Sequence, residues 1–173
     1  MQKKPQASSA TAPAARAGKL DVRLATEADI PALLDLADAL VEVDREFDPS
    51  LRTDYNRSGE GVKWFHETLG EEEAAVFVAG APAVFAMLIG RVAEAAPWRE
   101  TGGRIAEVEM LCVGPEARGN GCGKALLEAF AAWARERGAR RLWVRVSAAN
   151  ARALRFYRRE LFRDYDVILE RPA

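Results

Sequence analysis

A glycine-rich turn between a strand-like run and an amphipathic helix constrains the fold more than any other part of the sequence. Residues 104–113 are predicted to form a strand, residues 114–124 contain four glycines, and residues 121–137 carry apolar side chains at helical spacing. Glycines let the backbone approach a ligand closely, and a helix start presents unpaired N–H groups at the positive end of its dipole. Because Arg118 and Lys124 add positive charge, the turn is predicted to bind a phosphate or pyrophosphate.

The spacing within this turn excludes two common nucleotide-binding loops. A Walker A loop would need a glycine where Arg118 stands and a serine or threonine where Ala125 stands. The dinucleotide pattern G-x-G-x-x-G would need a glycine at Lys124 or Leu126. A different phosphate-binding arrangement is therefore indicated, and a glycine-rich turn without any ligand is the remaining alternative.

The other apolar runs alternate between strand and helix periods along the chain. The predicted order is strand, two helices, three strands, helix, strand, helix and strand, with a hairpin at Gly80, Ala81 and Pro82. This order is typical of an α/β or α+β sheet that has helices on its faces and binds ligands at the carboxyl ends of its central strands. The predicted strands are residues 20–25, 74–79, 84–92, 104–113, 141–146 and 165–170, and the predicted helices are residues 26–47, 62–69, 121–137 and 149–160.

Length and composition limit the classes of protein to consider. At 173 residues the chain has room for one domain, predicted at residues 19–173, after a tail at residues 1–18 that is predicted to be flexible. Two cysteines without a C-x-x-C pair and a single histidine, His66, argue against a disulfide framework and a zinc site, so no metal is predicted. No segment resembles a signal peptide or reaches the roughly 20 apolar residues of a membrane span, so a soluble, cytoplasmic protein is expected.

The turn fits the pattern R-x-x-G-x-G from Arg118 to Gly123, and here the sequence resembles the GNAT superfamily of N-acetyltransferases, which use acetyl-CoA. The resemblance covers residues 20–170 and is densest over residues 107–162. It implies a mixed, mostly antiparallel sheet of about six to seven strands flanked by about four helices, and a homodimer is common in that family. It also implies that the turn binds the pyrophosphate of coenzyme A and that the preceding strand pairs with the pantetheine arm. The residues that it assigns to the cofactor here are Leu111, Cys112, Val113, Arg118, Gly119, Asn120, Gly121, Cys122, Gly123 and Lys124.

Residues 146–157 resemble the second cofactor motif of the same family, with Asn150 and Tyr157 seven residues apart. Seven residues on a helix make about two turns, so the two side chains share one face. The resemblance implies that both bind the cofactor and that Tyr157 is the general acid that protonates the departing thiolate. The family usually carries glycine before Phe162, where this chain has Leu161, which leaves the geometry of that turn open.

Acetyl transfer to an amine needs a group that removes a proton from an ammonium whose pKa is about 10.4. Glu107 and Glu109 stand two residues apart on one predicted strand, so both point to the same face. Glu109 is the preferred base, because its position relative to Val113 matches an acidic residue in many family members, and Glu107 is the second candidate. The alternative is that both lie on a solvated face of the sheet. Strict alternation places Cys112 opposite Glu109, and both Cys112 and Cys122 are predicted to pack rather than to act as nucleophiles.

The formal net charge of −1 conceals two halves of opposite charge. Residues 21–110 contain 8 basic and 19 acidic residues, and residues 113–163 contain 12 basic and 4 acidic residues. The basic half suits an anionic cofactor, and the acidic half suits a cationic amine acceptor. A polyamine, an aminoglycoside, an amino acid and a protein amine all remain open as acceptors, and a solvated acidic face is the plainer alternative. The acidic residues in question, near the end of the first helix, are Asp35, Asp38, Glu42, Asp44, Glu46 and Asp48.

Two other functions remain as alternatives to an enzyme. A module of this fold could bind an acyl-CoA as a sensor without turnover, although the combination of Glu109, Asn150 and Tyr157 argues against it. The arginines of residues 140–159 could contact nucleic acid, but no motif with interleaved aromatic residues accompanies them, so no nucleic-acid partner is predicted.

Overall fold

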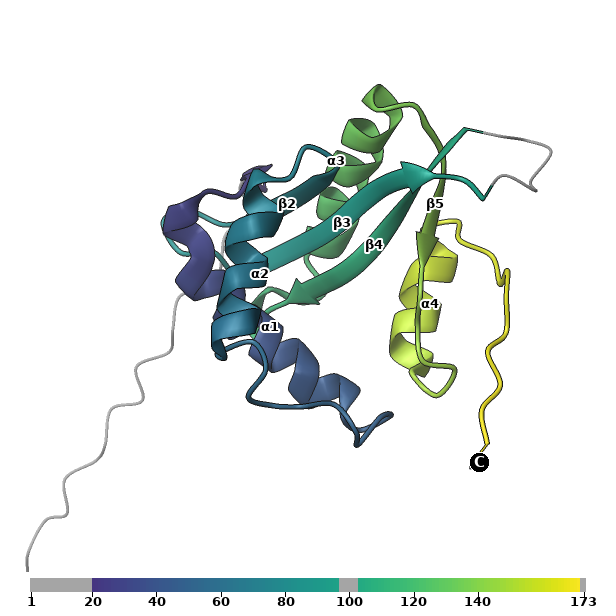
Figure 1. The fold of residues 1–173 in the computed structure, drawn as a ribbon, viewed down its shortest axis with the longest axis horizontal. Helices are drawn as coiled ribbons and strands as arrows, with labels where there is room; N and C mark the ends of the chain where they lie inside the picture. The colour runs from purple at the N-terminus through teal and green to yellow at the C-terminus, as the bar shows by residue number, and fades with distance from the viewer. Residues whose placement is uncertain (1–19, 97–102, 172–173) are drawn as a thin grey trace, which may run out of the picture.

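A computed structural model describes residues 20–96 and 103–171, and the predicted tail at residues 1–18 lies outside the described residues. Within the described ranges, a five-stranded sheet in the order β1-β2-β3-β4-β5 forms the centre, and four α-helices lie around it (Figure 1). Neighbouring strands are antiparallel except for β4 and β5, which are parallel. The expectation of a mixed, mostly antiparallel sheet flanked by helices is confirmed. The strands are β1 Val22–Leu24, β2 Ala74–Ala79, β3 Ala86–Glu94, β4 Arg104–Val113 and β5 Ala139–Val144.

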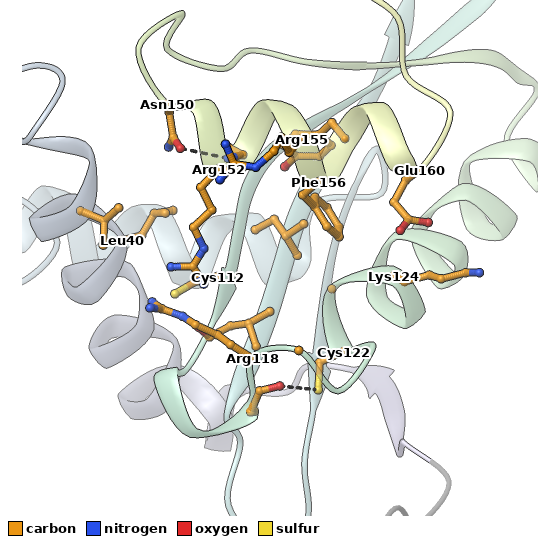
Figure 2. A pocket seen from close by; sticks show the side chains of 18 of the residues that line it. Leu40, Cys112, Arg118, Cys122, Lys124, Asn150, Arg152, Arg155, Phe156 and Glu160 are labelled. Carbon is orange, nitrogen blue, oxygen red and sulfur yellow. Dashed lines mark hydrogen bonds between the residues drawn. The ribbon is translucent and has the colours of Figure 1, made fainter.

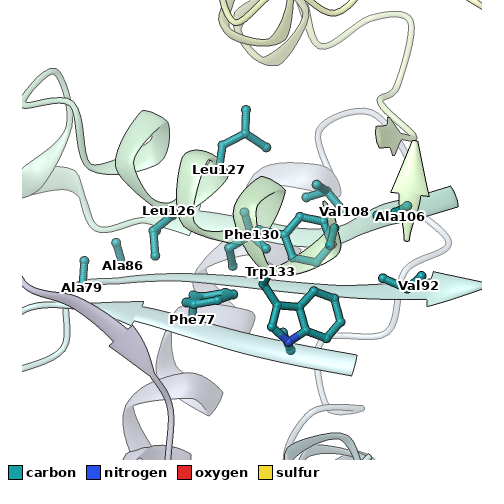
Figure 3. Close-up of a cluster of buried hydrophobic side chains, with 14 of the residues drawn as sticks. Phe77, Ala79, Ala86, Val92, Ala106, Val108, Leu126, Leu127, Phe130 and Trp133 are labelled. Carbon is teal, nitrogen blue, oxygen red and sulfur yellow. The ribbon is translucent and has the colours of Figure 1, made fainter. Parts of the chain in front are cut away.

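Two buried apolar clusters, one on each face of the sheet, attach the helices. On one face, Leu126, Phe130 and Trp133 of α3 pack among the inward side chains of β2, β3 and β4 (Figure 3). On the other face, Leu33 of α1 and Phe65 of α2 belong to a second cluster that includes side chains of β2, β3 and β4. The amphipathic stripes seen in the sequence account for both contacts. The helices are α1 Ile30–Asp44, α2 Gly59–Gly70, α3 Cys122–Glu136 and α4 Ala151–Arg159.

A β-bulge in β4 changes which face its residues occupy. Ile89 of β3 pairs with Met110 and Gly90 pairs with Val108, so Glu109 is an extra residue in the ladder. A bulge of this kind shifts the alternation of side chains by one residue. Cys112 therefore packs in the α1/α2 cluster, on the face where Glu109 also lies, and the prediction of strict alternation between these two residues was wrong.

The two parallel strands pair over only part of their length. The ladder between β4 and β5 runs from Arg104 and Ala139 to Val108 and Val144, whereas β4 continues to Val113. Among the described residues, no strand pairs with the β5-facing edge of β4 over residues 109–113. Backbone groups on that edge are therefore available to a ligand. Figure 1 shows β4 and β5 running apart on the side where α4 lies.

The predicted last strand, residues 165–170, is wrong. Residues 163–171 have no regular secondary structure, and Val167, Ile168 and Leu169 are all more than 80% exposed. Side-chain contacts hold the start of the segment instead of a ladder, because Asp164 pairs with Arg158 of α4 at 2.7 Å. The described residues therefore give a sheet of five strands, slightly fewer than the six to seven expected. An apolar run of strand length indicates β propensity but does not specify a partner strand.

Candidate active site

A pocket of about 640 Å³ lies where the end of β4, the glycine-rich turn, α4 and the end of α1 come together (Figure 2). This volume is within the range of small-molecule and cofactor sites. Asn120 is the one residue that was assigned to the cofactor from the sequence but does not belong to the pocket lining. The lining includes the others: Leu111, Cys112, Val113, Arg118, Gly119, Gly121, Cys122, Gly123, Lys124, Asn150 and Tyr157.

The turn owes its shape to glycines with left-handed backbone conformations. Gly119 has φ +81° and Gly121 has φ +80°, and open space surrounds the position of a Cβ at both. Other residues adopt this conformation only at a cost, so these glycines fix the curve of the turn while leaving its surface accessible. Arg118 Nε donates a hydrogen bond of 3.0 Å to the Val113 carbonyl oxygen, which ties the turn to the end of β4.

The turn leads directly into the N-terminus of α3, which starts at Cys122 without a side-chain cap. The first N–H groups of a helix lack intrahelical acceptors and attract anions. The ring of Phe156 from α4 approaches the same place, because a Cβ at Gly123 would lie 3.2 Å from the Phe156 Cζ. The glycine at this position thus allows α3 and α4 to pack closely beside the pocket.

Cations surround this part of the pocket. Lys124 lies 3.7 Å from Glu128, an exposed pair of modest strength, and Arg118 comes from the same turn. Three arginines of α4 also contribute to the lining, and Figure 2 shows two of them, Arg152 and Arg155, beside the pocket. From the sequence alone, Arg152 and Arg155 were candidates only for an arginine group that contacts nucleic acid. Helical spacing alone gave no signal for this role, because it places Arg152 and Arg155 on the side of α4 away from Asn150 and Tyr157.

Tyr157 is buried in the pocket wall, with 8% of its surface exposed. Its ring makes edge-to-face contacts with Phe156 and Phe162, at centroid distances of 5.0 and 5.4 Å. Burial raises the pKa of Tyr157, and the charge of Asp44 raises it further. The phenol therefore stays protonated at neutral pH and can serve as a proton donor. Asn150 lies two turns away and caps α4, since its Oδ1 accepts a hydrogen bond of 3.0 Å from the Ala153 N–H.

The turn that ends α4 has the hydrogen bonds of a regular helix C-terminus, although Leu161 stands where glycine is usual. Leu161 adopts φ +68°, and its N–H donates to the Arg158 carbonyl at 3.2 Å. The Phe162 N–H donates to the Tyr157 carbonyl at 3.0 Å. These two bonds make a Schellman motif, which normally uses glycine at the left-handed position. The side chain of Leu161 is 93% exposed, so the motif forms with a strained, solvent-facing leucine.

Glu107 and Glu109 lie on one face, as predicted, but neither lines the pocket. Glu109 Oε1 accepts a hydrogen bond of 2.7 Å from Arg91 Nε, and Arg91 also pairs with Glu71. Burial raises the pKa of Glu109, while the charge of Arg91 opposes the shift. Glu107 pairs with Arg145 at 2.7 Å. Glu109 stands next to the pocket-lining stretch of β4, on the side of the sheet where α1 and α2 lie.

Both cysteines contribute to the pocket without the features of a nucleophile. Burial raises the pKa of Cys112 and that of Cys122. Thiols with raised pKa values carry little thiolate at neutral pH and react slowly. Cys122 Sγ lies 3.4 Å from the Ala117 carbonyl oxygen, which it contacts as a weak donor. Both residues therefore suit packing roles.

One carboxylate in the lining, Asp44, was not singled out by the sequence, where it counted only as one of six acidic residues. It is the last residue of α1 and comes close enough to Tyr157 and Cys112 for its charge to raise the pKa of each. The approach of α1 to α4 depends on tertiary packing. The only sequence signal was an acidic residue at a helix C-terminus, where negative charge is disfavoured.

The described residues provide no group of three or more histidine, cysteine, aspartate or glutamate side chains that could hold a metal ion. In the same part of the chain, no helix is both long and apolar enough to cross a bilayer.

The fold and the pocket agree with the comparisons with known proteins. The profile of the Acetyltransferase (GNAT) family matches residues 39–161, which is most of the chain. A structure of a mutant protein from Bacillus halodurans superimposes with a TM-score of 0.79 at 22% identity, covering 88% of this chain and 99% of that one. AAC(6')-Iy in complex with the bisubstrate analogue CoA-S-monomethyl-acetylneamine gives a TM-score of 0.68 at 18% identity, covering 90% and 99%.

Streptothricin acetyltransferase from Streptomyces lavendulae is 46% identical over 52 residues. The match covers 30% of this chain and 28% of that protein, so it compares only part of the two sequences. The family match, in contrast, spans well over half of the chain and includes the turn and α4. This chain belongs to the GNAT family of acetyltransferases.

Proposed function

We propose that this chain is an N-acetyltransferase that moves an acetyl group from acetyl-CoA to the primary amine of a small cationic molecule or of a peptide or protein. The observation that carries the proposal is the pocket itself, in which the basic glycine-rich turn, the unpaired end of β4 and the buried Tyr157 come together. A pyrophosphate fits the turn and the start of α3, and an extended pantetheine arm fits the free edge of β4 at Leu111–Val113. The names of the relatives favour a small-molecule acceptor.

The chemistry follows from direct attack in a ternary complex. Glu109 does not line the pocket, so it takes a proton from the acceptor ammonium through a water, and the neutral amine forms a bond to the thioester carbonyl carbon. Backbone N–H groups of residues 111–113 hold the oxyanion of the tetrahedral intermediate. The carbon–sulfur bond then breaks, and the Tyr157 hydroxyl gives its proton to the thiolate. The tyrosinate regains a proton from the positively charged nitrogen, which leaves the neutral amide, and Glu109 releases its proton to solvent. A thiolate is already a fair leaving group, so the gain from Tyr157 is expected near the lower end of acid catalysis, about 10²-fold.

A screen of primary amines with acetyl-CoA, read as release of free thiol, tests the proposal. The wild type should acetylate at least one amine, and Tyr157→Phe should lower kcat about 10²-fold without weakening acetyl-CoA binding measured by calorimetry. A general base acts when deprotonated, so kcat/KM should rise with pH through the raised pKa of Glu109, and Glu109→Gln should abolish that limb of the profile.

Two outcomes would count against the proposal. If acetyl-CoA binds tightly but no amine is acetylated, the chain is a sensor or partner module and not an enzyme. If acetyl-CoA does not bind, the assignment of the pocket is wrong as well. Glu107→Gln decides between the two candidate bases, because Glu107 lies on the same strand and face and pairs with Arg145. A loss of the pH-dependent limb in Glu107→Gln but not in Glu109→Gln would make Glu107 the base.

A further inference from the structure

Asp44 differs from the other acidic residues at the end of α1, because it lines the pocket and is half-buried, whereas Glu42, Glu46 and Asp48 are exposed. Asp35 and Asp38 both pair with Arg57, at 2.5 and 2.7 Å, and Asp48 bonds to Ser50. Across residues 20–96 and 103–171, the Asp44 carboxylate has neither an ion-pair partner nor a hydrogen-bond donor. It is nonetheless half-buried, and burial raises its pKa. The free protein thus holds an uncompensated carboxylate in the wall of the pocket.

The position of Asp44 on α1 is a second reason why its charged form is unfavourable in the free protein. Asp44 is the last residue of the helix, where the helix dipole disfavours negative charge, and the last turn contains no basic residue. No basic residue in the last turn of α1 stabilises a carboxylate at this position. Costly placements of charged groups in a pocket are typical of functional sites, because a ligand supplies the missing partner.

The surroundings of Asp44 indicate what this ligand is. Leu40, one turn earlier on the same face of α1, also lines the pocket and lies on the side of Cys112 in Figure 2. Asp44, Tyr157 of α4 and Cys112 of β4 line the same pocket, so the carboxylate shares a cavity with the proposed proton donor and the free edge of β4, and its charge raises the pKa of both groups. The arginines and Lys124 of the lining belong to the turn and α4. The α1 side of the lining therefore carries a carboxylate without a partner, whereas the turn and α4 contribute five cations and one carboxylate, Glu160, which lies 3.7 Å from Arg159.

We propose that Asp44 binds the ammonium group of the acceptor and positions the amine beside Tyr157. This inference rests on the proposed function, since it assigns the acceptor end of the same pocket. Glu109 is less suited to hold the acceptor, because Arg91 already occupies its carboxylate and it does not line the pocket. Binding at Asp44 requires a cationic acceptor, so amines that carry a net negative charge should be poor substrates.

The test uses the full chain, Asp44→Asn and the matched control Asp48→Asn, which removes an exposed carboxylate four residues away. With the best amine from the screen, Asp44→Asn should raise the acceptor KM by about 10- to 100-fold, the usual range for losing a hydrogen bond to a charged group. The KM of acetyl-CoA should stay within twofold, Asp44→Glu should recover part of the acceptor affinity, and Asp48→Asn should leave all constants unchanged.

Stability separates a binding role from a structural one. Because the unpaired carboxylate destabilises the free protein, Asp44→Asn should raise Tm, whereas loss of a structural interaction would lower it. An unchanged acceptor KM, or an equal effect of Asp48→Asn, would overturn the inference.

A direct measurement of amine binding tests the role of Asp44 independently of whether the chain transfers acetyl groups. Spermidine and neamine are titrated by calorimetry into wild type and Asp44→Asn, each saturated with coenzyme A, which carries no acetyl group to transfer. Binding to the wild type and at least tenfold weaker binding to Asp44→Asn would support the cation site even if the screen finds no turnover. Absence of binding to the wild type, or equal binding to both proteins, would overturn it.

Discussion

At the scale of single residues, the strain at Leu161 has a measurable consequence. A left-handed conformation costs a residue with a Cβ about 1–2 kcal/mol, and glycine loses about 0.5–1 kcal/mol in backbone entropy on folding. Leu161→Gly should therefore increase the free energy of unfolding by about 0.5–1 kcal/mol and raise Tm by about 1–4 °C, measured by thermal unfolding. The exposed leucine side chain makes no buried contact whose loss would offset this gain.

Leu161→Ala is the control for this effect. Alanine keeps the Cβ that strains the left-handed turn, so it should give little of the stabilisation seen with glycine. If alanine stabilises as much as glycine, the gain comes from removing an exposed apolar side chain and not from backbone strain. Because Leu161 is exposed and does not line the pocket, neither change should alter acetyl-CoA binding by more than about twofold.

At the scale of elements, the bulge in β4 depends on the absence of a side chain on the neighbouring strand. A Cβ at Gly90 would lie 2.6 Å from the Glu107 carbonyl oxygen and would press against the ring of Phe130. Gly90→Ala should therefore lower the free energy of unfolding by about 1–3 kcal/mol, the usual cost of overpacking a core. Since the bulge also sets the position of Glu109, kcat should fall with it while acetyl-CoA binding stays within a few-fold.

Gly70→Ala provides the comparison, because a Cβ at the end of α2 meets no atom within 4 Å. Chemical denaturation of both variants separates the specific contact at Gly90 from a general effect of replacing glycine. Equal stability of Gly90→Ala and the wild type would show that β3 and β4 can move apart without cost, and that the position of Glu109 does not depend on this contact.

The elements also show what the sequence could and could not predict. The glycine-rich turn and the spacing of Asn150 and Tyr157 are local patterns, so they identified one wall of the pocket directly. The bulge at Glu109 has no signature in the order of residues, because it arises from the pairing of β4 with Gly90. Residues 165–170 have strand composition but no ladder, since composition does not choose a partner. The place of Asp44 in the pocket depends on how α1 packs in the folded chain.

At the scale of the whole molecule, charge is divided between the two sides of the pocket. The turn and α4 belong to residues 113–163, which carry 12 basic and 4 acidic residues, and α1 belongs to the acidic half. A field of this kind attracts an anionic cofactor and weakens with ionic strength. The basic residues of the lining are only partly neutralised, as the long Lys124–Glu128 pair shows. Binding of acetyl-CoA should therefore depend on salt and should stabilise the fold.

Thermal unfolding with acetyl-CoA measures this coupling. At a ligand concentration of about 100 times Kd, binding to the folded state alone adds about 2.7 kcal/mol, which corresponds to a rise in Tm of about 5–10 °C for a chain of this size. Raising the salt concentration tenfold should reduce the shift. Arg152→Gln, in the pocket lining, should reduce it more than Arg135→Gln, which removes the same charge from α3 outside the lining. Equal losses would mean that the overall field, not contact with Arg152, governs binding, and no shift with saturating acetyl-CoA would refute the cofactor assignment.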